Sequence, residues 1–70
     1  MQPISVQSSN VAAVQYSPVA LTLTVWFRSG GVYEYHGIAE HLFKSFLAAQ
    51  PHPWSAYGRQ IKAHAFKRLA

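Results

Sequence analysis

Cysteine is absent from the 70-residue sequence, and so is aspartate. Without cysteine the chain can form neither a disulfide framework nor a thiolate metal site, so packing alone must hold the fold together. The only side-chain carboxylates belong to Glu34 and Glu40. A two-carboxylate hydrolase would need both residues, and a Ser–His–acid triad would need one of them. We therefore expect that the protein is not an enzyme.

Long apolar runs are also missing. No window approaches the 18 or so uninterrupted apolar residues of a membrane-spanning helix. Residues 1–10 lack the basic start and apolar run of a secretory signal. No two of the four histidines form the i,i+4 pair that places two imidazoles on one helical face. We expect a cytoplasmic protein with no metal, no cofactor, no small-molecule substrate and no membrane partner.

What the sequence does contain is typical of a small folded domain. Half of the residues are apolar and 14% are aromatic, whereas disordered chains have few aromatic residues. Seventy residues suffice for one core. We predict a single domain over residues 10–70, preceded by residues 1–9 as either a flexible arm or a short edge strand.

Three strands are expected in the first half of the chain. Residues 11–16 form a β-rich run that ends at a Ser-Pro turn, and residues 20–27 alternate apolar with polar side chains in a period of two. Gly30 and Gly31 indicate a tight reversal before the strand of residues 32–36. A loop of residues 29–31 would define the pairing of these last two strands.

That loop would place Phe27 opposite Tyr33 and Val25 opposite Tyr35, with all four side chains on one apolar face. Trp26 would then lie on the other face.

Two helices are expected in the second half. Apolar residues recur at three- and four-residue steps from Ile38 to Ala49, and the run ends before Pro51. A similar spacing from Trp54 to Leu69 predicts a second, basic helix that reaches almost to the end of the chain. The fold class is therefore α+β: a three-stranded antiparallel meander followed by two α-helices packed on one face.

Several segments together resemble one family. They are Ser8-Ser9-Asn10, Leu23-Thr24-Val25-Trp26-Phe27, the turn glycines, Tyr33-Glu34-Tyr35 and the helix that begins at Ile38. This order resembles the KTSC domain, named for the C-terminal extension of some lysyl-tRNA synthetases and also found as small stand-alone bacterial and phage proteins. Tyr33 and Tyr35 match the Tyr-x-Tyr centre of the family. The family's aromatic-Asn-x-x-Ile-Arg stretch is Tyr57-Gly58-Arg59-Gln60-Ile61-Lys62 here. The synthetase context implies RNA binding.

Basic residues gather near the C-terminus. The formal net charge is +4, and the last twelve residues contain four of the six Lys and Arg side chains: Arg59, Lys62, Lys67 and Arg68. Such clustering favours a polyanionic partner, because positive potential attracts phosphate. We expect a nucleic-acid-binding module, with RNA as the first candidate. These four residues would contact phosphates, Arg28 would form a secondary patch, and Trp54 and Tyr57 would be available for stacking. Solubility and core packing explain the same residues without a ligand.

Trp26 supports a second hypothesis. A large aromatic side chain that points away from the core, beside Thr24, is typical of an interface. The alternative is therefore a protein-interaction or homo-oligomerising domain that uses the sheet face around Trp26.

Overall fold

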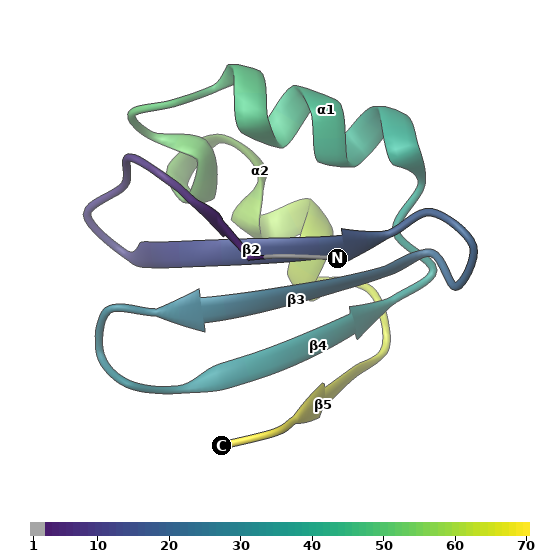
Figure 1. The fold of residues 1–70 in the computed structure, drawn as a ribbon. Helices are drawn as coiled ribbons and strands as arrows, with labels where there is room; N and C mark the ends of the chain where they lie inside the picture. Colours follow the sequence, from purple (N-terminus) through teal and green to yellow (C-terminus); the bar gives the residue numbers. More distant parts are fainter. Residues whose placement is uncertain (1–2) are drawn as a thin grey trace.

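The computed structural model describes residues 3–70, which form one antiparallel sheet and two helices (Figure 1). The strands lie side by side in chain order, β1-β2-β3-β4-β5, and both helices come between β4 and β5. The elements are β1 (Ile4–Ser5), β2 (Val11–Ser17), β3 (Thr22–Phe27), β4 (Val32–His36), α1 (Glu40–Ala48), α2 (Pro53–Lys62) and β5 (Phe66–Arg68). The predicted α+β class with two helices is confirmed.

The prediction of a three-stranded sheet is wrong, because a strand is added at each edge. β1 pairs with β2, so the first segment of the chain provides an edge strand. At the other edge, α2 ends at Lys62 and residues 66–68 return to pair with β4. The helix predicted to reach Leu69 is therefore ten residues long. Pairing with β4 overrides the helical spacing, since it gives partners to the main-chain groups of an otherwise open edge.

The turn between β3 and β4 corrects the predicted pairing. The amide of Phe27 donates to the carbonyl of Gly31 at 2.9 Å, and Gly30 takes a φ of +108°, which only glycine adopts readily. Val25 therefore lies opposite Tyr33, two residues away from the predicted partner. A shift of two residues leaves every side chain on its expected face, because the alternation along a strand has a period of two.

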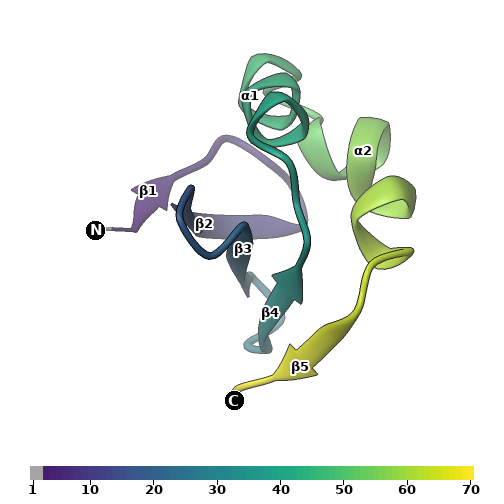
Figure 2. The same ribbon diagram turned by 90° about the vertical axis from the view of Figure 1, so that its right-hand side faces the viewer.

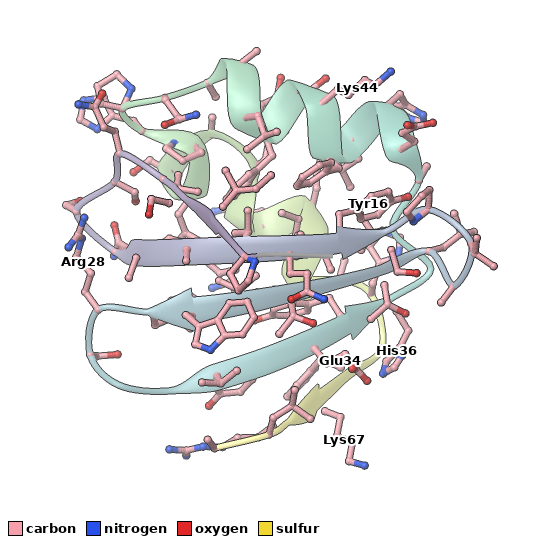
Figure 3. All side chains as sticks on the ribbon, in the orientation of Figure 1. Tyr16, Arg28, Glu34, His36, Lys44 and Lys67 are labelled. Atoms are coloured by element: carbon pink, nitrogen blue, oxygen red, sulfur yellow. The ribbon has the colours of Figure 1, made fainter. Side chains whose placement is uncertain are left out.

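Both helices cover the same face of the twisted sheet (Figure 2). β2, β3 and β4 place their inward side chains beneath the helices, where Phe46 of α1 and Ile61 of α2 are fully buried. The core consists of Val6, Val11, Val14, Tyr16, Leu23, Val25, Tyr35, Ile38, Phe46 and Ile61. No helix of the described residues covers the opposite face, which we call the outer face; Glu34, His36 and Lys67 point from it (Figure 3).

One buried hydrogen bond ties the sheet to the start of the helical layer. The hydroxyl of Tyr16 on β2 donates to the carbonyl of Ile38 at 2.6 Å, and its ring stacks on Phe43 of α1 with centroids 4.6 Å apart. Burial, and then the nearby Glu40 carboxylate, raises the pKa of Tyr16 above its usual 10.0. The residue thus connects β2 both to the loop that leads into α1 and to α1 itself.

Candidate ligand pocket

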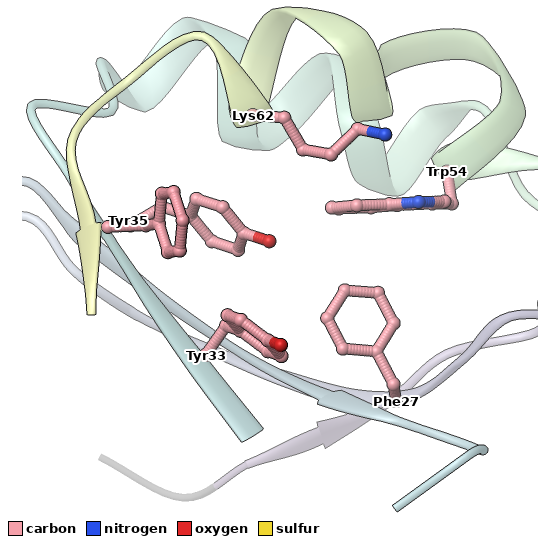
Figure 4. Close-up of a pocket in the computed structure, with 6 residues that line it drawn as sticks. Phe27, Tyr33, Tyr35, Trp54 and Lys62 are labelled. Atoms are coloured by element: carbon pink, nitrogen blue, oxygen red, sulfur yellow. The ribbon is translucent and has the colours of Figure 1, made fainter. Parts of the chain in front are cut away.

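A pocket of about 420 Å³ opens between the sheet and α2 (Figure 4). Five of the residues that line it are aromatic: Phe27, Tyr33, Tyr35, Trp54 and Phe66. The sixth is Lys62. We call this site the aromatic pocket. Its size lies toward the lower end of the range for small-molecule sites, about 300–1,000 Å³.

β5 supplies one side of the aromatic pocket through its register. Phe66 lies opposite Tyr35, and Arg68 lies opposite Tyr33. Paired residues share a face, so Phe66 and Arg68 point to the helical side of the sheet. The ring of Phe66 stands 5.9 Å from both tyrosine rings and is 58% exposed, so much of its surface remains free for a ligand.

Trp54 supplies the wall on the α2 side. Its indole packs edge-to-face on Phe27, with centroids 4.9 Å apart and planes at 83°. On the helix, a Cβ added at Gly58 would stand only 2.9 Å from two atoms of the indole. Gly58 therefore permits the indole to lie directly against the backbone of the next turn. The glycine, which lowers helix propensity, has a packing role here.

Two hydroxyls form the polar part of the aromatic pocket. Those of Tyr33 and Tyr35 point into it (Figure 4). Burial, and then the neighbouring Tyr33, raises the pKa of Tyr35 above 10.0. The Tyr35 hydroxyl is therefore neutral at physiological pH. A tyrosine hydroxyl can donate or accept a hydrogen bond.

The charge at this site is positive. Lys62 extends its amine across the aromatic pocket toward Trp54 (Figure 4). The guanidinium carbon of Arg68 stands 5.7 Å from the centre of the Tyr33 ring, a cation–π distance. No described residue that lines the aromatic pocket carries a carboxylate. Both cations favour a ligand that carries negative charge.

Comparison with known proteins identifies the family. The sequence profile of the KTSC domain matches residues 7–66. The chain belongs to the KTSC domain family. The crystal structure of a KTSC domain protein from Yersinia pestis superposes with a TM-score of 0.88 at 26% identity, covering 99% of this chain and 97% of that one. No curated protein matches the chain.

In this KTSC domain the basic residues predicted to act together are divided between two faces. Lys62 is on α2, and Arg59 lies one helical turn before it. Lys67 and Arg68 are on β5 rather than on a helix, and they point to opposite faces. Lys67 lies opposite Glu34 on the outer face. The prediction of one basic helix is therefore wrong, because the four cations are divided between α2 and β5.

Arg28 has a structural role that the sequence did not indicate. Its Nε donates to the carbonyl of Ser8 at 2.7 Å, and its amide donates to the carbonyl of Asn10 at 2.9 Å. The side chain thus fixes the loop between β1 and β2 to the end of β3 (Figure 3). It lies outside the set of residues that line the aromatic pocket.

The aromatic residues predicted for stacking also separate. Trp54 lines the aromatic pocket, whereas Tyr57 is half-buried and packs on the core. Trp26 lies on the outer face as expected, between its strand partners Ala13 and Val32. Its side chain is partly exposed there.

Two other classes of site have no candidate within residues 3–70. No three histidine, cysteine, aspartate or glutamate side chains lie close enough together there to hold a metal ion. Within the same residues, no helix is long and apolar enough to cross a membrane.

The sequence did not reveal how two residues of the aromatic pocket come to line it. Phe27 was expected to be part of the apolar sheet face, and Phe66 was placed on a helix. The three-residue β5 is too short to give a strand pattern of its own, so its contribution depends on the tertiary pairing with β4.

Proposed function

We propose that this KTSC domain is a non-enzymatic module that binds single-stranded nucleic acid, with RNA as the first candidate. The observation that carries the proposal is an aromatic pocket with Lys62 in its lining and Arg68 over Tyr33. The proposal includes the cytoplasmic location that the sequence analysis expects, because single-stranded RNA is available in the cytoplasm.

The combination of rings and cations suits a nucleotide. Bases stack on aromatic side chains, each such contact contributing about 1–3 kcal/mol, and phosphates pair with Lys and Arg. An aromatic cage can also bind a quaternary ammonium ion. The ammonium of Lys62 would repel such a ligand here, and the lining contains no carboxylate to offset its charge.

The concave shape favours single strands. In a duplex the bases are stacked and paired, so their faces cannot enter a recess between a helix and a sheet. Protein modules that read single strands use bases splayed out of the stack. Arg59, one turn before Lys62, extends the positive charge along α2 for the phosphates of flanking nucleotides.

Fluorescence anisotropy tests this function with labelled single- and double-stranded RNA and DNA at about 50 and 200 mM salt. Three phosphate contacts, by Arg59, Lys62 and Arg68, would give a salt slope of about 2 on single strands, or roughly a 20-fold loss of affinity across this range. The double variant Lys62→Gln, Arg68→Gln should leave a slope of about 0.7.

The matched control is Lys44→Gln. Lys44 is an exposed cation of α1, 3.9 Å from Glu40 and outside the lining of the aromatic pocket. Its replacement removes one positive charge, half of what the double variant loses, and should leave the slope unchanged. Absence of binding at 50 mM salt would refute the proposed function, and equal loss in the control and the double variant would refute the site.

The outer face supports the second candidate, a protein-interaction or self-assembling role. Trp26 is partly exposed on the outer face, which no helix of the described residues covers (Figure 2). Sedimentation of the wild type and of Trp26→Ala tests it. An oligomer that dissociates in the variant would support this role, whereas a monomer in both would remove it.

A further inference from the structure

We infer that the aromatic pocket is a single-base site, in which one unstacked nucleobase lies among the rings and its polar edge meets the Tyr33 and Tyr35 hydroxyls. This inference rests on the proposed function and names the part of the ligand that the pocket holds. A pocket of about 420 Å³ suits one nucleoside rather than a longer stretch of strand.

The rings provide apolar surface on more than one side of a base. Trp54 comes from α2, Phe66 from β5, and the two tyrosines from β4. Phe66 remains 58% exposed although it is aromatic and stands 5.9 Å from each tyrosine ring. Covering this surface with a flat, apolar-faced ligand would remove it from water.

The tyrosine hydroxyls give the pocket a polar edge that the protein does not use. Neither hydroxyl takes part in a side-chain hydrogen bond within residues 3–70. The hydroxyl of Tyr16, by contrast, donates to a main-chain carbonyl. Every fully buried side-chain oxygen or nitrogen of these residues has a partner. The two tyrosine hydroxyls have none, so they are not fully buried, and both point into the pocket (Figure 4). Each can donate to or accept from a base, because a tyrosine hydroxyl does both.

The cations would then take the phosphate attached to the bound base. Lys62 reaches over the pocket from α2, and Arg68 lies beside Tyr33 on the β5 side. The two cations stand on different elements at the border of the same recess. A nucleotide with its base in the pocket would therefore have a cation near its phosphate, whether the phosphate lay on the α2 side or on the β5 side.

Nucleoside 5′-monophosphates and ribose 5-phosphate make a matched pair of probes, since they share the sugar and phosphate and differ in the base. Binding is followed by the fluorescence of Trp54 in a Trp26→Phe background. We expect the nucleotides to bind about fivefold to 150-fold more tightly than ribose 5-phosphate, which is the range for one stacked base. Equal binding of the two probes would overturn the inference.

Three variants test the residues. Phe66→Ala should weaken nucleotide binding severalfold or more and leave ribose 5-phosphate unchanged. Leu69→Ala is its control, because Leu69 is a comparably exposed apolar residue, 47% exposed, outside the pocket lining. Tyr33→Phe keeps the ring and removes the hydroxyl, so it should weaken nucleotides a few-fold. Unchanged nucleotide binding in Phe66→Ala would also overturn the inference.

The outcomes separate this inference from the function on which it rests. Salt-dependent binding of oligonucleotides, together with equal binding of nucleotides and ribose 5-phosphate, would overturn the single-base site and leave the proposed function intact. Binding of nucleotides without binding of oligonucleotides would refute the proposed function and keep the pocket as a mononucleotide site. Absence of both would overturn both.

Discussion

Replacing Gly58 with alanine should destabilise the domain even though alanine is the better helix former. Gly58 lies within α2, and the Cβ of an alanine would stand 2.9 Å from two ring atoms of Trp54. The indole cannot simply retreat, because it packs at 4.9 Å on Phe27 and at 6.5 Å on Phe46. The variant must therefore move the indole away from its place in the aromatic pocket or shift the helix.

Two opposing effects determine the magnitude. The gain in helix propensity from glycine to alanine is about 1 kcal/mol. Overpacking a well-filled site costs about 1–3 kcal/mol. The free energy of unfolding should therefore fall by up to about 2 kcal/mol, where propensity alone would raise it by about 1 kcal/mol.

Urea unfolding of Gly58→Ala, followed by Trp54 fluorescence in a Trp26→Phe background, measures the net change in the free energy of unfolding. Ser55→Ala is the control: Ser55 is an exposed residue of the same helix, so its replacement should raise stability by a few tenths of a kcal/mol. We also expect Gly58→Ala to change the native emission of Trp54. A stabilisation of about 1 kcal/mol, with unchanged emission, would refute the packing role of Gly58.

Three further predictions concern stability and the pocket. Tyr16→Phe should lower the free energy of unfolding by about 1 kcal/mol in urea, because it leaves the Ile38 carbonyl without its donor; no change would contradict this role. The raised pKa values of Tyr16 and Tyr35 mean that the unfolded chain ionises first, so stability should hold below pH 10.0 and fall as pH rises above it; a rise in melting temperature there would contradict the burial of these phenols. A chain that ends at Ala65 lacks β5 and should lose nucleotide affinity; circular dichroism checks that it still folds, and a folded truncation with wild-type affinity would exclude β5 from the site.

The sequence predicted the elements whose pattern is local. The alternation of β3 and the helical spacing of α1 gave the correct class and the correct faces, since a strand with one buried face is strongly specified by that alternation. The pairing of Val25 was wrong by two residues, because Gly31 belongs to the strand pair and the loop begins one residue earlier than expected. The predicted face of each side chain is nevertheless correct, because the error is an even number of residues.

The end of α2 could not be predicted in the same way. Ala65 and Leu69 continue the helical spacing of Trp54 and Ile61, so the local pattern favours a longer helix. The strand at residues 66–68 forms because β4 offers an edge, which is a property of the assembled sheet.

The candidate site was predicted in part for the same reason. Lys62, Trp54 and the two tyrosines were singled out from the sequence, and the structure brings them together in one pocket. Lys67 could not be separated from Arg68 without the strand, since neighbours on a strand point to opposite faces.

The measurement that tests the central claim most directly is an NMR titration of the labelled protein with a short single-stranded RNA. The two tryptophan indole N–H signals report on the two faces, Trp54 on the aromatic pocket and Trp26 on the outer face. We predict that the Trp54 indole and the amides of Lys62 and Phe66 shift with added RNA while the Trp26 indole stays in place. Shifts confined to Trp26 and its neighbours, or no shifts at all, would contradict the account.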